Sequence, residues 1–292
     1  MPTPPPSRVL LAFDGSRQEL RDRAAALAPI VRQHFEVAST HEDLDQAIDE
    51  KELGPDGAEW VVAMGGDGTM LRTARAMGRN QAPIVGVNLG RLGFLAGLNP
   101  ERLDKALGEI AAGKFRIVRH VMLDCTLVAA DGAETSRLAL NEAAVLAGEP
   151  FRMIDAQLYV DGDLAATYSC DGFLVGTPVG STAHNLAIGG PILRKDIDAV
   201  VLSSINPHTL TVRPVVDSPD RTYEIVVADP NPGTRLLVDG KVVGPLRPGD
   251  RVRVERSPAV FQMVEVAGQT YYRTLRNKLG WGSRPRAPKE TP

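Results

Sequence analysis

A short glycine-rich segment, residues 65–69 with the sequence GGDGT, carries residue types that suit phosphate chemistry. It stands between an apolar run at 59–64, typical of a buried strand, and a helix-like segment at 69–77. Ligands of open α/β sheets bind at such strand ends, and glycines let the backbone approach a ligand closely and adopt positive φ. The following helix start supplies free N–H groups and a positive dipole end. The predicted phosphate contacts are Gly65, Gly66, Gly68 and Thr69.

Asp67 is the residue of this loop that phosphate binding alone does not explain, because a carboxylate repels phosphate. It could hold a metal ion or accept the proton of an attacking hydroxyl, and its structural alternative is a helix cap in a tight turn. Phosphoryl transfer depends mainly on the positioning of the reacting groups and little on the strength of the base, so an aspartate with an ordinary pKa would suffice as proton acceptor. The segment is not a P-loop, because no Gly-Lys-Ser/Thr follows. It is not the dinucleotide fingerprint either, because Leu71 replaces the third glycine.

The surrounding elements predict an α/β domain followed by a mostly antiparallel β domain. In the first third, apolar runs alternate with helix-like segments, as in a Rossmann-like parallel sheet. Beyond residue 115, Asp-Gly pairs at 131–132, 161–162 and 239–240 separate apolar runs and predict hairpins, with a helical exception after Ser181. The expected strands are 8–13, 59–64, 83–88, 123–129, 156–160, 199–205, 222–228, 236–238, 241–243, 251–255 and 260–266, and the expected helices are 18–34, 69–77, 100–112 and 271–282.

Composition limits the class of protein. The 292 residues carry a net charge of −3, which does not support a basic surface for nucleic acid. No apolar run approaches the roughly 20 residues of a membrane helix. The N-terminus lacks the basic start and apolar core of a secretory signal, and the 2 cysteines, Cys125 and Cys170, form no metal-binding or disulfide pattern. We therefore expect a cytoplasmic protein that takes no nucleic acid or membrane as partner.

Several further motifs, together with GGDGT, resemble the NAD kinase family. They follow one another in the family's order between about residues 61 and 282, and the ordered set is far more specific than the glycine motif alone. The blocks are GVNLGRLGFL at 86–95, NE at 141–142, DG at 171–172, GTPVGSTAH at 176–184, GGP at 189–191, PHTL at 207–210, RP at 213–214 and LRNKLGW at 275–281.

The resemblance implies transfer of the ATP γ-phosphoryl group to the 2′-hydroxyl of the adenosine ribose of NAD, which gives NADP. It implies ATP and NAD as substrates, a divalent metal, with Mg²⁺ arriving on the nucleotide phosphates rather than in a protein cage, and a homo-oligomer, dimer or tetramer. The second domain is expected to be β-sandwich-like. The implied organisation is a disordered tail at 1–6, an α/β domain at 7–114, a β-rich NAD-binding domain at 115–268, a C-terminal helix at 269–282 packing on the first domain, and a disordered tail at 283–292.

Carried over residue by residue, the resemblance makes Asp67 the proton acceptor for the 2′-hydroxyl and an NAD contact. Gly68 matches a backbone contact to NAD. Arg72 lies one turn into the helix, where its guanidinium could pair with the pyrophosphate or remain solvated. Asn141 and Glu142 match a pair that binds the nucleoside, and amide and carboxylate chemistry suits that role.

The other implied NAD contacts lie in the second domain. Asp171 matches a binding carboxylate, although Asp-Gly is also typical of a hairpin turn. Arg152 and Ser169 fall at family contact positions, and Lys241 falls where the family often has glutamine; Arg152 and Lys241 could equally be solvated surface residues. The stretch against the adenine-side nucleoside is Thr182, Ala183, His184, Asn185, Leu186 and Ala187.

The chain departs from the family's longest signature at three positions. Gly176 replaces a serine, Val179 replaces a threonine and His184 replaces a tyrosine, while Asn185 follows where serine is common. The histidine keeps a flat ring that could stack on adenine. Two alternatives remain beside the leading hypothesis: a related small-molecule or lipid kinase, and a non-catalytic NAD(P)-binding sensor. The intact Asp67 argues against the sensor, and the blocks at 141–142 and 181–184 argue against the lipid kinase.

Overall fold

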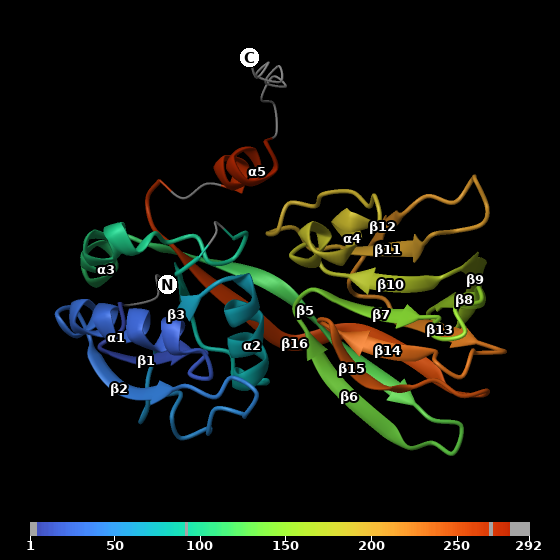
Figure 1. Cartoon of the computed structure of the whole chain (residues 1–292), viewed down its shortest axis with the longest axis horizontal. Coiled ribbons are helices and arrows are strands. Elements are labelled where there is room, and N and C mark those ends of the chain that lie inside the picture. The colour runs from blue at the N-terminus through green and yellow to red at the C-terminus, as the bar shows by residue number, and fades with distance from the viewer. Residues whose placement is uncertain (1–4, 91–92, 269–270, 281–292) are drawn as a thin grey trace, which may run out of the picture. The chain divides into compact units, whose positions relative to one another are not determined.

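The structure is a computed structural model that describes residues 5–90, 93–268 and 271–280. The chain divides into two compact units, each with its own strands and helices (Figure 1). The first contains residues 1–73, 84–117 and 264–292, and the second contains 74–83 and 118–263. Several predictions lie outside the described residues: the tail segments 1–4 and 283–292, Arg91 and Leu92 of the 86–95 block, and the two ends of the terminal segment at 269–270 and 281–282.

The first unit, called the α/β unit here, is built on a parallel sheet in the order β2-β1-β3-β4. The sequences RVLLAF, WVVAMG and IVGVN are almost wholly buried, as expected for parallel strands covered on both faces. The strands are β1 (Arg8–Phe13), β2 (Glu36–His41), β3 (Trp60–Gly65) and β4 (Ile84–Asn88), and the helices are α1 (Gln18–Arg32), α2 (Asp67–Met77), η1 (Pro100–Arg102), α3 (Leu103–Ala111) and α5 (Tyr271–Leu279).

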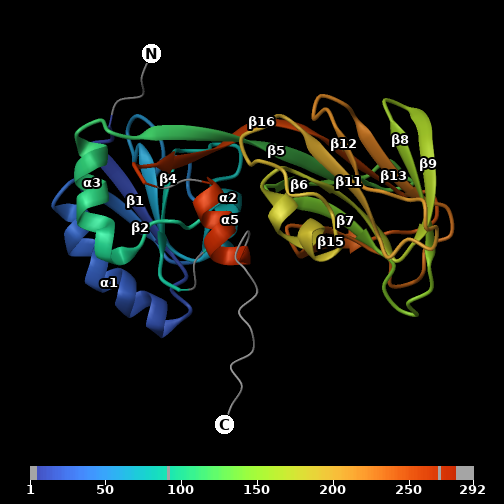
Figure 2. The ribbon, with the colours of Figure 1, turned by 90° about the horizontal axis from the view of Figure 1, so that it is seen from above.

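Helices α1 and α3 lie together on one face of this sheet (Figure 2). Their apolar residues recur at helical spacing and pack against β1 and β3, for example Leu20 and Val31 of α1 and Leu107 of α3. Helix α2 follows β3 directly, and the boundary between the units falls inside it. No helix in the described part of the chain combines the length and apolar character needed to cross a membrane.

The second unit, called the β unit here, contains antiparallel strands from two sheets with a shared apolar core. Phe173 of one sheet and Tyr223 of the other are both almost completely buried in it. The strands are β5 (Arg116–Val128), β6 (Glu134–Ala139), β8 (Ile154–Val160), β9 (Asp163–Cys170), β13 (Tyr223–Val227) and β16 (Arg251–Glu265) of one sheet, and β12 (Val215–Asp217), β11 (Val200–Ile205), β10 (Gly172–Gly176), β7 (Glu142–Leu146), β14 (Arg235–Val238) and β15 (Lys241–Pro245) of the other. The short helices η2 (Gly180–Thr182) and α4 (His184–Ala187) interrupt them.

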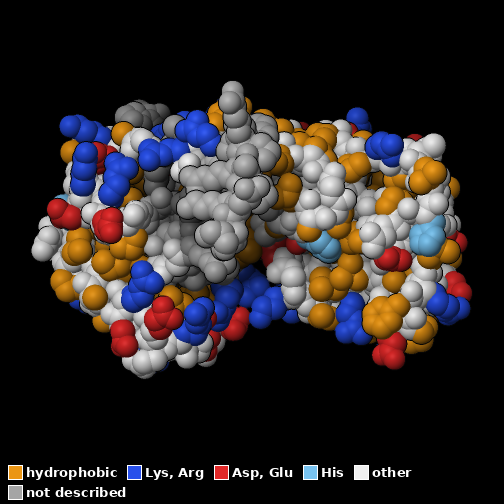
Figure 3. All heavy atoms as spheres, turned by 45° about the horizontal axis from the view of Figure 1, so that its top comes forward, with side chains coloured by type: hydrophobic (Ala, Val, Ile, Leu, Met, Phe, Trp, Pro, Cys, Tyr) orange, Lys and Arg blue, Asp and Glu red, His pale blue; other side chains and the backbone are white. Residues whose placement is uncertain are grey.

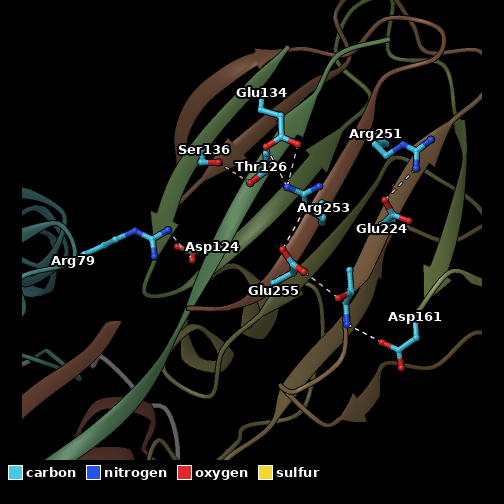
Figure 4. Close-up of polar contacts among 11 residues, drawn as sticks. Arg79, Asp124, Thr126, Glu134, Ser136, Asp161, Glu224, Arg251, Arg253 and Glu255 are labelled. Atoms are coloured by element: carbon cyan, nitrogen blue, oxygen red, sulfur yellow. Dashed lines mark hydrogen bonds and ion pairs between the residues drawn. The ribbon is translucent and has the colours of Figure 1, made fainter. Parts of the chain in front are cut away.

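Buried apolar residues alternate with charged residues along β16, and the charged ones form ion pairs on the outer face of the β unit. Val252 and Val254 of β16 face the core, whereas Arg253 faces outward and contacts Glu134 of β6 at 3.2 Å and Glu255 at 3.2 Å (Figure 4). Exposed pairs of this kind contribute about 0–1 kcal/mol each. The apolar face of the strand, rather than these pairs, therefore holds the sheet in place.

The predicted fold class, an α/β domain followed by a mostly β domain, is confirmed, as are the three Asp-Gly hairpins. Two expectations were wrong, and strands β2, β7, β10 and β12 were not predicted. For β2 the reason is its edge position, which leaves EVASTH without a buried apolar run. The two strands expected at 251–266 form the single strand β16. The hairpin alternative for Asp171 is wrong, because β9 before it and β10 after it belong to different sheets.

Candidate functional site

The GGDGT segment joins β3 to α2 at the carboxyl edge of the parallel sheet. Gly65 ends β3 and Asp67 begins α2, two residues earlier than predicted. The carbonyl of Gly66 accepts hydrogen bonds from the backbone N–H groups of Thr69 at 3.0 Å and Met70 at 3.2 Å. A side chain at Gly66 or Gly68 would meet no heavy atom within 4 Å. The loop therefore exposes backbone beside open space at the positive end of a helix, an arrangement suited to a phosphate.

One expectation about these glycines was wrong. None of the three lies among the described residues with positive φ, so the loop does not need glycine for a left-handed conformation. A Cβ at Gly65 would instead overlap the side chain of Thr69. Glycine is required at this position by close packing, and at Gly66 and Gly68 its absent side chain leaves the backbone accessible.

Asp67 lies in a cradle formed by the segment 93–96. Its Oδ2 accepts a hydrogen bond from Phe94 N at 2.7 Å, and its Oδ1 accepts from Leu95 N at 2.8 Å and Ala96 N at 3.1 Å. A Cβ at Gly93 would overlap the carboxylate, so only glycine fits there. The cradle holds Asp67 by backbone donors, which satisfy a charged carboxylate.

A lysine from the far end of the chain completes the surroundings of Asp67. Lys278, in the last turn of α5, places Nζ 3.3 Å from Asp67 Oδ2 and 4.2 Å from the centroid of the Phe94 ring. Side chains of Lys278 and Asp67 are 32% and 29% exposed, so the pair is accessible to solvent. Lys278 is not among the site residues predicted from the sequence. It belongs there to a basic group with Arg273 and Arg276 that could meet phosphates or an acidic neighbour, and a solvated basic tail was the preferred interpretation. The contact with Asp67 shows that Lys278 has an acidic neighbour.

Arg72 is held by two carboxylates rather than solvated. Its guanidinium donates to Asp14 at 2.7 Å and to Asp45 at 3.0 Å. Asp14 follows β1, and its pKa is lowered below the usual value, first by a hydrogen bond from Ser16 and then by Arg72. A pyrophosphate would have to share or replace these carboxylates to reach Arg72.

In the β unit, Asn141 and Glu142 stand at the start of β7 and are both buried. Asp239, in the hairpin between β14 and β15, accepts hydrogen bonds from the backbone N–H groups of Leu140 at 2.9 Å, Asn141 at 2.7 Å and Glu142 at 3.1 Å. Sequence reasoning missed Asp239, because its Asp-Gly pair looks like that of the two ordinary hairpins. Its carboxylate fixes the backbone of the Asn-Glu pair.

Glu142 has the most unusual environment of the nominated residues. Its residue is 7% exposed, and Oε2 is a buried oxygen without a hydrogen-bond partner in the described structure. Burial, followed by the nearby charge of Asp239, raises the pKa of the carboxyl to about 8. A buried polar atom without a partner is uncommon, so this oxygen is a candidate contact for a bound ligand or a water molecule.

The GTPVGSTAH signature packs against this pair. Thr177 donates its backbone N–H to the carbonyl of Asn141 at 2.7 Å and its hydroxyl to the carbonyl of Leu140 at 2.5 Å. A Cβ at Gly180 would overlap the carbonyl of Asn141, so the two segments approach as closely as glycine allows. Two blocks that are far apart in the sequence therefore form one cluster.

The segment from Thr182 to Ala187 divides into buried and accessible residues. Asn185 is fully buried, and its amide donates to the carbonyls of Ser181 at 3.3 Å and Pro191 at 3.0 Å and accepts from Ser203 at 2.8 Å. Because these hydrogen bonds engage both ends of the amide, the Asn185 side chain stabilises the local fold. The partly or fully accessible members are Thr182, Ala183, His184, Leu186 and Ala187.

The remaining nominated residues make other contacts. Asp171 accepts from Asn206 Nδ2 at 3.0 Å, and the hydroxyl of Ser169 donates to the carboxylate of Asp155. Arg152 lies exposed on the loop before β8, and Lys241 is the exposed first residue of β15. The structure thus shows a cluster of 141–142 with 177–180 and a separate pair of polar contacts at 169 and 171.

The site elements are a glycine loop with an aspartate at a sheet edge and a buried Asn-Glu pair in a β-sandwich, a combination expected of a nucleotide-binding phosphotransferase. The chain matches the ATP-NAD kinase N-terminal domain over residues 15–115 and the ATP-NAD kinase C-terminal domain over 140–266. The NAD kinase of Rhodopirellula baltica is 48% identical over 96% of this chain and 88% of its own length. That of Aromatoleum aromaticum is 39% identical over 79% of this chain and 77% of its own.

Two solved structures resemble this one. The NAD kinase from Archaeoglobus fulgidus in complex with ATP is 30% identical, with a TM-score of 0.70 over 94% of this chain and 97% of that chain. Yeast NADH kinase complexed with NADH shares the fold, with a TM-score of 0.85 at 22% identity over 98% of this chain and 90% of that chain. The chain belongs to the NAD kinase family, which confirms the resemblance found in the sequence.

Proposed function

We propose that this protein transfers the γ-phosphoryl group of ATP to the 2′-hydroxyl of the adenosine ribose of NAD and releases NADP and ADP. The observation that carries the proposal is the placement of Asp67. The carboxylate begins α2, next to glycine backbone beside open space. An anion can lie along that backbone while a hydroxyl approaches the carboxylate, which is the geometry that in-line phosphoryl transfer requires.

In this mechanism Asp67 accepts the proton of the 2′-hydroxyl as the new O–P bond forms and the bond from the γ-phosphorus to ADP breaks. Backbone N–H groups of Gly66 and Gly68, at the N-terminus of α2, bind the phosphates, while the N–H of Thr69 donates to the carbonyl of Gly66. The 93–96 segment holds the carboxylate in place through its three backbone donors. Positioning of this kind supplies most of the catalysis expected for phosphoryl transfer.

The β unit supplies the dinucleotide contacts. Glu142, protonated at neutral pH because its pKa is about 8, offers a hydroxyl donor to the nucleoside. Asn141 adds an amide, and His184 offers a flat ring for stacking on a base. Arg72, Arg152, Ser169, Asp171 and Lys241 complete the proposed NAD contacts, together with the segment from Thr182 to Ala187. For Asn185, only the backbone is proposed to contact the ligand, because its amide is engaged.

The divalent ion is proposed to arrive with ATP. The described residues contain no group of three His, Cys, Asp or Glu side chains that could hold a metal ion. The donor set of the chain therefore suits Mg²⁺ bound mainly by nucleotide phosphates, an ion that usually keeps few protein ligands. When bound, the ion would neutralise charge on the phosphates.

A cytoplasmic homo-oligomer completes the proposal. Cys125 and Cys170 are both unpaired and buried, which suits a reducing compartment. Figure 3 shows apolar side chains among charged ones on the surface of the β unit, and exposed apolar surface of this kind favours a protein interface. The exposed large apolar residues of this unit include Phe151, Met153, Leu210, Val215 and Val216. The domain limits proposed are 7–114 and 115–268, with the terminal helix at 269–282.

The test measures NADP formation from Mg·ATP and NAD with a coupled, NADP-specific dehydrogenase. Wild-type protein should turn over, and Asp67→Asn should lower kcat by about 10³-fold or more while NAD still binds in calorimetry. Asp163→Asn, an exposed change in β9, is the matched control and should behave as wild type. Phosphorylation of a lipid or sugar without NADP formation would contradict the proposal, as would NAD binding without turnover.

A further inference from the structure

The carboxylate of Asp67 has as many donors as it can accept. Phe94 N at 2.7 Å and Lys278 Nζ at 3.3 Å approach Oδ2, while Leu95 N at 2.8 Å and Ala96 N at 3.1 Å approach Oδ1. An ionised carboxylate offers about four lone-pair positions, so these donors occupy all of them. A substrate hydroxyl can hydrogen-bond to Asp67 only after one donor leaves.

Lys278 is the donor that can leave. The other three are backbone groups of the 93–96 segment, whose approach is fixed by the close contact between Gly93 and the carboxylate. Lys278 reaches Asp67 on a flexible four-carbon stem from the last turn of α5, and its side chain is 32% exposed. Its other contact is the face of the Phe94 ring, a cation–π interaction that keeps the ammonium close to the loop after the ion pair opens.

The glycine loop lacks a cation of its own, since GGDGT carries no lysine of the kind that a P-loop aims at phosphates. An anionic group bound in the loop would lie close to the Asp67 carboxylate, and the two like charges would repel each other. The ammonium of Lys278 lies 3.3 Å from that carboxylate, so it can both offset the repulsion and contact a phosphoryl oxygen placed beside the hydroxyl. The C-terminal helix thus brings to the loop the charge that the loop does not contain.

We propose that Lys278 is a further catalytic residue. In the substrate-free protein it occupies Oδ2 of Asp67, and on substrate binding it yields this position to the 2′-hydroxyl and binds an oxygen of the phosphoryl group being transferred. The O–H bond then breaks toward Asp67, the bond from O2′ to phosphorus forms, and ADP leaves with the electrons of the broken P–O bond. This inference rests on the proposed function, because it needs Asp67 as the proton acceptor.

The test compares Lys278→Met with Lys278→Arg, and uses Arg276→Met as the control. Arg276 is an exposed residue of the same helix, so its change removes one positive charge without touching the Asp67 carboxylate. Lys278→Met should lower kcat by about 100-fold, the effect of losing one charged transition-state contact. Its Kd for NAD, measured by calorimetry without ATP, should stay equal or decrease because the competing donor is gone. Lys278→Arg should recover kcat to within about tenfold of wild type.

The outcomes separate a catalytic lysine from a structural one. A kcat for Lys278→Met within twofold of wild type would overturn the proposal, and so would a loss that Lys278→Arg does not recover. A merely structural lysine would instead lower the Tm and weaken NAD binding in Lys278→Met, which also overturns it. NADP formation by wild type and Arg276→Met in the same assay distinguishes failure of this inference from failure of the proposed function.

Discussion

In the α/β unit the carboxylate of Asp67 meets donors on both oxygens, whereas in the β unit Oε2 of Glu142 is buried without a partner. Burial without donors favours the neutral form of a carboxyl group. The pKa of Glu142 is accordingly raised to about 8. The two carboxyl groups therefore differ in their surroundings, and we assign them different tasks: Asp67 accepts a proton and Glu142 donates a hydrogen bond.

Among the predictions that test this difference between Asp67 and Glu142, the largest change in activity is expected for Gly93→Ala. The added methyl group would overlap the Asp67 carboxylate, so the carboxylate must leave its backbone donors. A displacement of about 1 Å at a reacting group can lower the rate about 100-fold, and we expect a loss of kcat of that size with NAD binding retained.

Gly90→Ala is the matched control for this change, because a Cβ at Gly90 would meet no heavy atom within 4 Å. Steady-state kinetics of both variants measure how much kcat depends on the position of the Asp67 carboxylate. Equal kcat values for Gly93→Ala and Gly90→Ala would show that the position of Asp67 is not critical.

A second prediction concerns the pH dependence that Glu142 gives to stability. Burial, and then the charge of Asp239, raises its pKa from 4.5 to about 8, so the folded protein holds this proton more tightly than the unfolded chain. The stabilising contribution is fully present below pH 4.5 and is lost as the pH rises through about 8. The free energy of unfolding of wild type should therefore fall with pH relative to that of Glu142→Gln, which cannot ionise.

Urea unfolding of both proteins at several pH values between about 5 and 9 measures this difference. Comparison with the glutamine variant removes contributions from groups that titrate in both proteins. If the free energies of unfolding of wild type and variant change with pH in parallel, Glu142 is ionised in the folded state. Its environment would then not favour the neutral form, contrary to the difference from Asp67 described above.

The smallest effect should come from Arg253→Met on the outer face of the β unit. This change removes the contacts with Glu134 and Glu255, both at the surface (Figure 4). Exposed ion pairs contribute about 0–1 kcal/mol, so thermal unfolding should shift little and NADP formation should not change. A loss of activity in this variant would mean that the outer sheet face, and not only the two carboxyl sites, supports catalysis.

Much of the fold was predictable because it follows from local patterns. Buried apolar runs marked β1, β3 and β4, and Asp-Gly pairs marked the three hairpins, since both signals depend on residues close in sequence. Strand β2 was not predicted, because an edge strand needs no continuous apolar run. For Asp171, the local turn signal favoured a hairpin, but the chain there passes between sheets, a choice that depends on which strands lie nearby.

The sequence by itself determined the family, the order of the elements and the aspartate at the end of β3, because these are written in contiguous motifs. The tertiary structure alone decided which groups surround each carboxyl. Lys278 meets Asp67 across 211 positions, and Asp239 meets Asn141 across 98. Such contacts depend on how helices and strands pack, and the free energy of packing is shared among many distant residues that no local pattern records.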